Sequence, residues 1–305
     1  MKNVKTLLIF VTISTFIFAS TTRTGVLGGA GFWADDYANI TAFPASVNNH
    51  QVAWTDGGTD FTSVWKDDGG TTWGFAGGTG NDIVDLWWGN GNMGVNFGLG
   101  MTPENEDTGV EAETAINVGF GMPLAGMDFG VNYAMGGEAY GGGAVAVNLR
   151  RAQNIWLFNN MLVNFGMGLA GEDDVAEPAT MDLGVDCYTI NTYANGINSL
   201  FGLGFNYNDS GVEGEDAGMG IEWNFAVESN MTDWAVLRVG YNHAYDFASG
   251  GSGDGLSAGL GFNYGSFSLD MVLNSYNSLL TDPVRYINGR NSEALGGAWT
   301  ISYNW

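Results

Sequence analysis

The feature that most constrains this chain is an alternation of apolar residues with small or polar residues, repeated many times with a period of two. Between residues 93 and 101, for example, Met93, Val95, Phe97, Leu99 and Met101 alternate with Gly and Asn. The pattern recurs at 127–135, 163–169, 219–227, 237–247, 256–264, 267–273 and 299–305. Successive side chains of a β-strand point to opposite faces, so this period predicts strands with one apolar and one polar face. We expect an all-β fold.

Composition excludes several other classes of protein. Gly accounts for 49 of 305 residues, and Gly weakens the interior of a helix by about 1 kcal/mol relative to Ala, which argues against a helical bundle. Aromatic residues make up 13% of the chain, whereas acidic disordered chains have few aromatics. The formal net charge is −24 with only 9 Lys and Arg, so the clustered basic residues that bind nucleic acid are lacking.

The connections between the expected strands alternate in length, and this places the sheet in a membrane. Short links lie at 123–126, 151–154, 228–233 and 265–266. Long polar links lie at 102–114, 136–143, 170–180, 208–218, 248–255 and 274–297. Tyr and Trp end many of the apolar faces: Tyr207, Trp223, Trp234, Tyr245, Tyr264, Tyr303 and Trp305. Short turns at one end, long loops at the other and aromatic girdles are typical of an outer-membrane barrel. We therefore expect an antiparallel transmembrane β-barrel.

The same alternation gives the number of strands. Twelve are clear, and four weaker candidates precede them at 50–56, 60–66, 71–77 and 82–88. The best count is 16 strands within a range of 12–16, and an even number fits the up-and-down order of such barrels.

The first twenty residues have the layout of a secretory signal peptide. Lys2 and Lys5 precede an apolar run from Thr6 to Phe18, which is too short to span a bilayer as a helix. We expect a signal peptide at 1–20, an N-terminal plug or periplasmic segment at 21–45 and the barrel at 46–305. Cys187 is the single cysteine, so no internal disulfide is expected.

Two segments resemble known families. The stretch from Trp299 through Ile301 and Tyr303 to Trp305 is similar to the assembly signal of bacterial outer-membrane barrels, which the barrel assembly machinery recognises. The stretch from Leu27 to Ile40, with its Asp35–Asp36 pair, and the turn Phe43–Ala45 resemble the start of the fatty-acid-transporter (FadL-like) family. Phe43 stands where that family has Asn. This resemblance implies a segment folded into the lumen as a hatch, and uptake of hydrophobic substrates.

The polar face of each strand should line the lumen, where charges are few. Asp128, Glu222, Arg238 and Asp270 are the charged candidates, and the last three lie on strands close together in sequence. They are open to two interpretations: a constriction that biases ion selectivity, or a structural ion pair that ties the barrel wall together.

Acidic residues gather in the long loops at the expected mouth: Glu104, Glu106, Asp107, Glu111, Glu113, Glu172, Asp173, Asp174, Glu177, Asp209, Glu213, Glu215 and Asp216. A negative mouth concentrates cations and repels anions, which predicts cation preference. No spacing typical of a calcium loop or of a zinc site is present, so we expect no bound metal and no cofactor.

The sequence does not indicate an enzyme. Only His50 and His243 are present, and no Ser nucleophile motif accompanies them. The function expected first is a porin-like channel for passive diffusion of small polar solutes, with cation preference. Two alternatives stay open: FadL-like uptake of hydrophobic substrates, and a structural or adhesive surface barrel without an open pore. Expected partners are the lipid bilayer, lipopolysaccharide, the assembly machinery and small solutes, with a homo-oligomer left open. The expected location is the outer membrane of a Gram-negative bacterium.

Overall fold

The computed structural model describes residues 21–57, 60–77, 82–104, 112–135, 143–171, 178–194, 196–273 and 298–305. The signal-peptide prediction for residues 1–20 lies outside this part of the chain. Most of the remaining residues form strands, and the helices lie near the N-terminal end.

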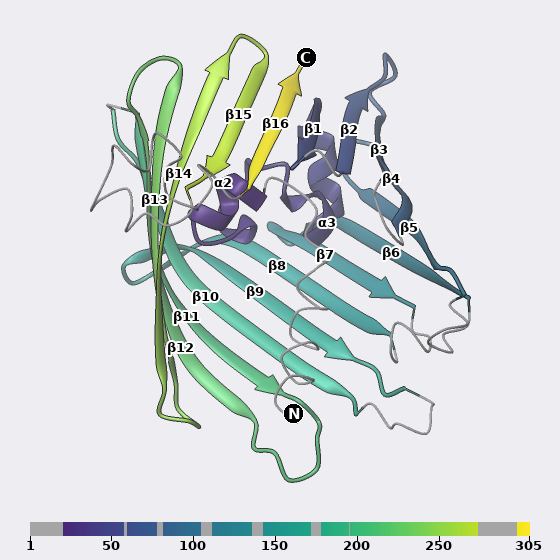
Figure 1. The fold of residues 1–305 in the computed structure, drawn as a ribbon, viewed down its shortest axis with the longest axis vertical. Coiled ribbons are helices and arrows are strands. Elements are labelled where there is room, and N and C mark those ends of the chain that lie inside the picture. The colour runs from purple at the N-terminus through teal and green to yellow at the C-terminus, as the bar shows by residue number, and fades with distance from the viewer. Residues whose placement is uncertain are drawn as a thin grey trace.

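Sixteen antiparallel strands form one closed barrel, in which each strand pairs with its neighbours in sequence and β1 pairs with β16 (Figure 1). The strands are β1 Val52–Asp56, β2 Asp60–Lys66, β3 Thr72–Gly77, β4 Asp82–Gly89, β5 Gly94–Thr102, β6 Glu113–Leu124, β7 Met127–Ala134, β8 Ala144–Ile155, β9 Phe158–Gly168, β10 Thr180–Thr192, β11 Ile197–Asp209, β12 Gly218–Asn230, β13 Ala235–Asp246, β14 Ser252–Tyr264, β15 Phe267–Val272 and β16 Trp299–Asn304. The predicted all-β fold and the best count of 16 strands are confirmed.

The two faces of the barrel wall separate as the alternation predicts. On β11, Phe201, Leu203 and Phe205 are exposed, while Leu200, Gly202 and Gly204 on the alternate positions are buried. The exposed residues share the face that carries Phe225 on β12 and Leu256 on β14, and both of those are also exposed. Apolar side chains therefore cover the outside of the wall, where lipid would lie, and the inward face carries polar and small residues together with apolar residues that pack on the plug.

Short turns join the strands at one end of the barrel, and local side-chain bonds set several of them. Asp67 Oδ1 accepts the backbone N–H of Thr71 at 2.9 Å, and Thr232 Oγ1 accepts that of Ala235 at 3.0 Å. Side chains of this kind commonly close a turn by bonding nearby backbone. One expected turn lies elsewhere: β8 continues to Ile155, past the expected 151–154 link, and the chain reverses at Trp156 and Leu157.

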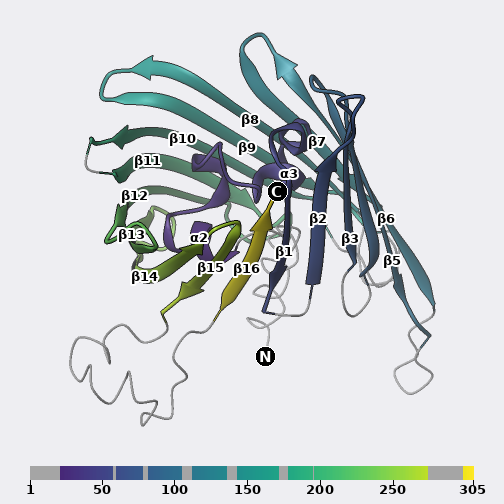
Figure 2. The same cartoon turned by 90° about the horizontal axis from the view of Figure 1, so that it is seen from above.

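An N-terminal segment lies inside the barrel, as both views show (Figures 1 and 2). It contains α2 Thr21–Val26, η1 Ala30–Phe32, α3 Asn39–Ala42 and η2 Pro44–Asn49, and we call residues 21–50 the plug. Helix α2 contacts β13 to β16, whereas η2 contacts β3 to β7 on the other side of the wall. The plug therefore spans the barrel. Within the described residues, no helix has the length and apolar character needed to cross a membrane.

Glycines in the wall let the plug approach it closely. A Cβ atom at Gly130 would overlap the carbonyl oxygen of Ala42, and one at Gly240 would overlap that of Val26. Only a residue without a side chain fits where two backbones meet at this distance. Part of the high glycine content thus serves the contact between wall and plug.

Two apolar clusters fill the space around the plug. One joins Ile40 and Val47 to Trp54 and Trp87 of the wall. The other joins Leu27, Phe32 and Phe43 of the plug to inward-facing wall residues that include Tyr188 and Leu200. Burial of each such side chain stabilises the folded protein by about 1.5–3 kcal/mol, so plug and wall are held together by a common apolar core.

Candidate functional site

Among the described residues, three arginines lie in the interior of the barrel, and each of them bonds to a carboxylate. Arg23 belongs to α2, Arg150 to β8 and Arg238 to β13. All three guanidinium groups lie where the plug meets the wall. The arrangement of these charges decides what the lumen can attract or repel.

Glu228 on β12 lies at the centre of the largest group. Its carboxylate accepts bonds from Arg23 Nε at 3.0 Å and from Arg238 Nε at 2.8 Å. Arg238 Nη1 also donates to Asp270 on β15 at 2.5 Å. These side chains are nearly buried, with exposed fractions of 14% for Arg23, 11% for Glu228 and 7% for Arg238. Buried pairs of this type are strong only while every partner is present.

The plug completes this group from its own side. Arg23 Nη1 donates to Asp36 at 2.6 Å, and Asp35 lies 3.9 Å from Arg23 Nη2. Burial acts to lower the pKa of Arg23, but the hydrogen bond and charge of Glu228 and the charge of Asp36 outweigh it and leave that pKa above its usual value. Burial also raises the pKa of Asp36, and Arg23 opposes that rise. Arg23 is thus a cation fixed between plug and wall.

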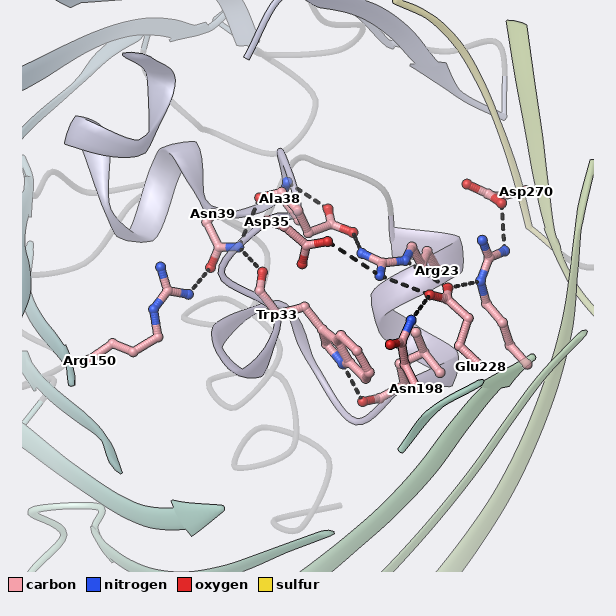
Figure 3. Close-up of polar contacts among 12 residues, drawn as sticks. Arg23, Trp33, Asp35, Ala38, Asn39, Arg150, Asn198, Glu228 and Asp270 are labelled. Atoms are coloured by element: carbon pink, nitrogen blue, oxygen red, sulfur yellow. Dashed lines mark hydrogen bonds and ion pairs between the residues drawn. The ribbon is translucent and has the colours of Figure 1, made fainter. Parts of the chain in front are cut away.

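Arg150 forms a second contact between wall and plug. Its guanidinium donates to Asp128 at 2.9 and 3.0 Å, to the carbonyl of Gly31 at 3.1 Å and to Asn39 Oδ1 at 3.0 Å. The guanidinium carbon also lies 4.5 Å from the centre of the Phe43 ring. Figure 3 shows Arg150 and Glu228 on opposite sides of the plug, with Asn39, Trp33 and Arg23 between them.

Three inward-facing carboxylates on β10 and β12 have no such partner among the described residues. Asp182 and Asp186 on β10 and Glu222 on β12 share the inward phase of their strands, and no Lys or Arg among the described residues forms a salt bridge with them. Asp182 accepts a bond from Asn208 Nδ2. Asp186 and Glu222 lie on either side of Gly204, where β10, β11 and β12 run side by side. The lumen wall here is negative.

Inward-facing residues become accessible to solvent away from the plug. Asn224 is nearly buried at 4% exposure and lies next to Gly28 of the plug. Asn206 and Asn242, nearer the long-loop end, are exposed although they face inward. The lumen between the plug and the long-loop end is therefore solvated and lined by amides, small residues and carboxylates.

The four lumen residues proposed from sequence fall into three places. Arg238 and Asp270 bond to each other, which is the arrangement that ties the wall together. Asp128 lies far from them and pairs with Arg150 at 2.9 Å. Glu222 joins neither group and remains one of the three carboxylates without a basic partner. These four residues do not form a single constriction.

Sequence reasoning missed the residues that hold the plug. Arg23, Arg150 and Glu228 were not singled out, and Asp36 was noted only as part of the acidic pair in the FadL-like resemblance. A lone Arg close to an Asp pair in a Gly-rich stretch is the signal that marks them. Glu228 has no such signal, because it lies at the end of a strand next to an expected turn.

His243 and Cys187 lie on the outward face of the wall, and His50 lies in the plug. His243 faces outward, stacks on Trp223 with ring centres 4.5 Å apart, and has its Nδ1 3.6 Å from Asp254. His50 ends the plug, and burial lowers its pKa to about 4. Cys187 is free, and within the described ranges no three His, Cys, Asp or Glu residues are placed to hold a metal ion.

The acidic loop residues are only partly described. Glu213, Glu215 and Asp216 lie exposed in the β11–β12 loop, and Glu104 follows β5. Glu106, Asp107, Glu172, Asp173 and Asp174 lie outside the described residues. On β16, Trp299, Ile301 and Tyr303 share the outward face, and Trp305 follows the strand with its N–H 3.4 Å from the carbonyl of Gln51.

A closed, sixteen-stranded antiparallel barrel with an apolar outer face defines the class of the protein: it is a bacterial outer-membrane β-barrel, located in the outer membrane of a Gram-negative cell. Only closed barrels and helices satisfy every backbone group in lipid. This assignment depends on the barrel itself.

Comparison with known proteins adds the following. No protein-family model matches the chain, and no curated protein matches it. Among solved structures it is similar to the outer-membrane expressed OmpT of Vibrio cholerae, with 11% identity, a TM-score of 0.43 and coverage of 83% of this chain and 96% of that one. It is also similar to the translocator domain of the autotransporter NalP from Neisseria meningitidis, with 11% identity, a TM-score of 0.30 and coverage of 94% and 100%.

Proposed function

We propose that the protein is a porin-like channel through which small polar solutes diffuse passively, with a preference for cations. One observation carries this proposal: within the part of the chain that the structure describes, the arginines inside the barrel are all paired with carboxylates, while Asp182, Asp186 and Glu222 form no salt bridge with a basic residue. Unpaired negative charge on a solvated wall attracts cations and repels anions. The exposed acidic loop residues Glu213, Glu215 and Asp216 act in the same direction at the mouth.

The side chains that line the solvated lumen suit the passage of polar solutes better than that of apolar ones. Inward-facing Asn206 and Asn242 are exposed, and Asn donates and accepts hydrogen bonds, as sugars and hydrated ions require. The apolar side chains inside the barrel, such as Trp54 and Leu200, are buried against the plug. They therefore offer no free surface to a hydrophobic solute.

The experiment is to reconstitute the purified barrel in planar bilayers and measure the reversal potential in a KCl gradient. We expect a sign that indicates cation preference. A unit charge attracts an ion at about 8 Å in water with about 0.5 kcal/mol, so Asp186→Asn or Glu222→Gln should each lower the permeability ratio about twofold. Asp254→Asn is the matched control, because it removes an outward-facing charge from β14, two strands away from β12, and should leave the ratio unchanged.

Two results would contradict the proposal. A reversal potential that indicates anion preference would show that the unpaired carboxylates do not set the ion selectivity. A barrel that inserts, shifts its gel mobility on heating and yet conducts no ions would instead support a structural or adhesive role. Liposome swelling with a series of sugars then defines the size of solute that passes.

A second candidate function, uptake of hydrophobic substrates, is favoured by one observation. The segment that resembles the start of the FadL-like family lies inside the barrel, where Ile40 packs near Trp54 and Trp87 and Leu27 and Phe32 pack near Tyr188 and Leu200. Bound fatty acid or detergent recovered with the purified protein would support this candidate. The same assay with Asn206→Leu tests it further, since a more apolar lumen should bind more of such a ligand.

We also propose the partners expected from sequence. The apolar outer face and its aromatic residues fit a lipid bilayer with lipopolysaccharide in the outer leaflet. The outward-facing residues of β16 suit recognition by the barrel assembly machinery, which Trp305→Ala should weaken in an outer-membrane fractionation assay.

A further inference from the structure

Helix α2 is joined to the rest of the plug by two glycines in an unusual backbone conformation. Gly28 has φ of 88° and Gly29 has φ of 122°. Residues with a side chain rarely adopt a positive φ. A Cβ at Gly29 would meet no atom within 4 Å. This junction is therefore free of side-chain packing at Gly29 and suited to a change of backbone direction, as a hinge requires.

The contacts that hold α2 against the wall are polar bonds together with the packing of Val26, which is 1% exposed, against Gly240 and Gly259. Its sequence, Thr-Thr-Arg-Thr-Gly-Val, contains one large apolar residue, Val26. Thr22 Oγ lies 2.8 Å from Thr300 Oγ on β16, and Ser257 on β14 donates to the carbonyl of Val26 at 3.1 Å. The charged contact is Arg23 with Glu228, in which both oxygens of the carboxylate accept bonds at 3.0 and 3.2 Å.

The carboxylate of Glu228 bonds to the plug and to the wall at the same time. It bonds to Arg23 from the plug and to Arg238 from the wall, and Arg238 is itself held by Asp270 (Figure 3). Without Glu228, Arg23 keeps its ion pairs with Asp36 and Asp35, which both belong to the plug. Removing one partner of a buried ion pair leaves the others uncompensated, so the contact is lost as a unit.

We propose that α2 is a lid that swings on Gly28–Gly29, and that Glu228 is the latch that keeps it docked on β12–β16. The role of the lid in controlling flow rests on the proposed channel function. The docking equilibrium itself does not, and it can be measured without any conductance. Residues 39–49, packed on the opposite wall, remain in place as the fixed end of the plug.

The test is a labelling assay on the full-length barrel, with Cys187→Ser in every protein to remove the native thiol. Thr22→Cys places a probe in α2, where Thr22 is 1% exposed, and Ser46→Cys places one in η2, where Ser46 is 7% exposed. A water-soluble maleimide reacts with a thiol only when it is exposed. Labelling rates relative to the denatured protein give the undocked fraction of each end.

We expect Glu228→Gln to speed labelling of the Thr22→Cys probe about a hundredfold and to leave the Ser46→Cys probe unchanged. Arg23→Gln should have the same effect, and it leaves the Glu228–Arg238–Asp270 group of the wall intact, so it serves if Glu228→Gln does not fold. Arg150→Met is the matched control: it removes an interior Arg that contacts the plug elsewhere, and the Thr22→Cys rate should not change.

Conductance separates this proposal from the proposed function. Thr22→Cys with Thr300→Cys allows a disulfide between α2 and β16, because the two hydroxyl oxygens that the sulfurs replace lie 2.8 Å apart. We expect reduction of this disulfide in a Glu228→Gln background to raise conductance. Faster labelling without any conductance in any variant supports the lid and contradicts the channel. Conduction that is the same in oxidised and reduced protein, or Thr22→Cys labelling unchanged in both folded latch variants, overturns the lid.

Discussion

The two ends of the plug are attached to the barrel by different physical means. Around η2, backbone lies against wall glycines such as Gly94 and Gly130, and Val47 is fully buried. Around α2, the Arg23–Glu228 pair and two hydroxyl bonds add to a close contact between Val26 and wall Gly240. Close packing depends on shape, whereas ion pairs depend on charge and on the presence of every partner. One short segment can thus have a fixed end and a releasable end.

The largest effect should come from filling a glycine at the fixed end. Gly130→Val places side-chain atoms where the carbonyl oxygen of Ala42 lies, so either the wall or α3 must move. Overpacking of this kind costs about 3 kcal/mol, equivalent to about a hundredfold rise in the labelling rate of the Ser46→Cys probe.

The control for this prediction is Gly253→Val. Gly253 also faces inward, on β14, and a Cβ there would meet nothing within 4 Å. It should fold and label as the parent protein does. If the two valine variants behave alike, shape complementarity is not what fixes the η2 end, and the contrast between the two ends fails.

A second prediction concerns pH at the fixed end. His50 ends η2, its ring lies 6.4 Å from that of Tyr37, and its Nε2 is buried without a hydrogen-bond partner in the described structure. Burial lowers its pKa to about 4, while the charge of Asp35 acts in the opposite direction. The usual pKa is about 6.5, so docking stability is complete above that pH and is lost as the pH falls towards 4.

We expect the docked state of η2 to lose roughly 2 kcal/mol between pH 7.5 and 4.5. The measurement is the labelling rate of Ser46→Cys, normalised at each pH to the denatured protein so that the reactivity of the thiol cancels. His50→Gln should remove most of the dependence. A parent protein whose docking does not weaken on acidification would show that His50 is not buried neutral.

Most of the barrel could be predicted from sequence, because its signal is local. Strand parity depends only on neighbouring residues, and it placed even weak strands such as β1 and β3. The end of β8 was misplaced because Arg150 and Arg151 interrupt the apolar pattern. In the structure Arg150 faces the plug and Arg151 lies on the opposite face of the strand, so the strand continues through both.

The interior site was much harder to predict, because its partners are distant in sequence. Parity assigned an inward face to Arg238 and Asp270, but Arg23 and Glu228 are 205 residues apart. No periodicity reports a contact between a plug and a wall. The pairing follows only from the closed barrel, which brings β12 to the α2 end of the plug.

The smallest predicted effect concerns the hinge, and it compares one substitution at two sites. Gly28 has φ of 88°, so Gly28→Ala strains the docked backbone by about 1 kcal/mol, although its Cβ would lie at an ordinary 3.5 Å from Leu200. The Thr22→Cys probe should then label about fivefold faster. Gly25 lies within α2 with nothing within 4 Å of its Cβ position, and Ala favours a helix by up to about 1 kcal/mol over Gly. Gly25→Ala should therefore slow labelling. If Gly28→Ala speeds labelling and Gly25→Ala slows it, the motion is assigned to the backbone at Gly28. If both substitutions change the labelling rate in the same direction, α2 leaves the wall without turning there.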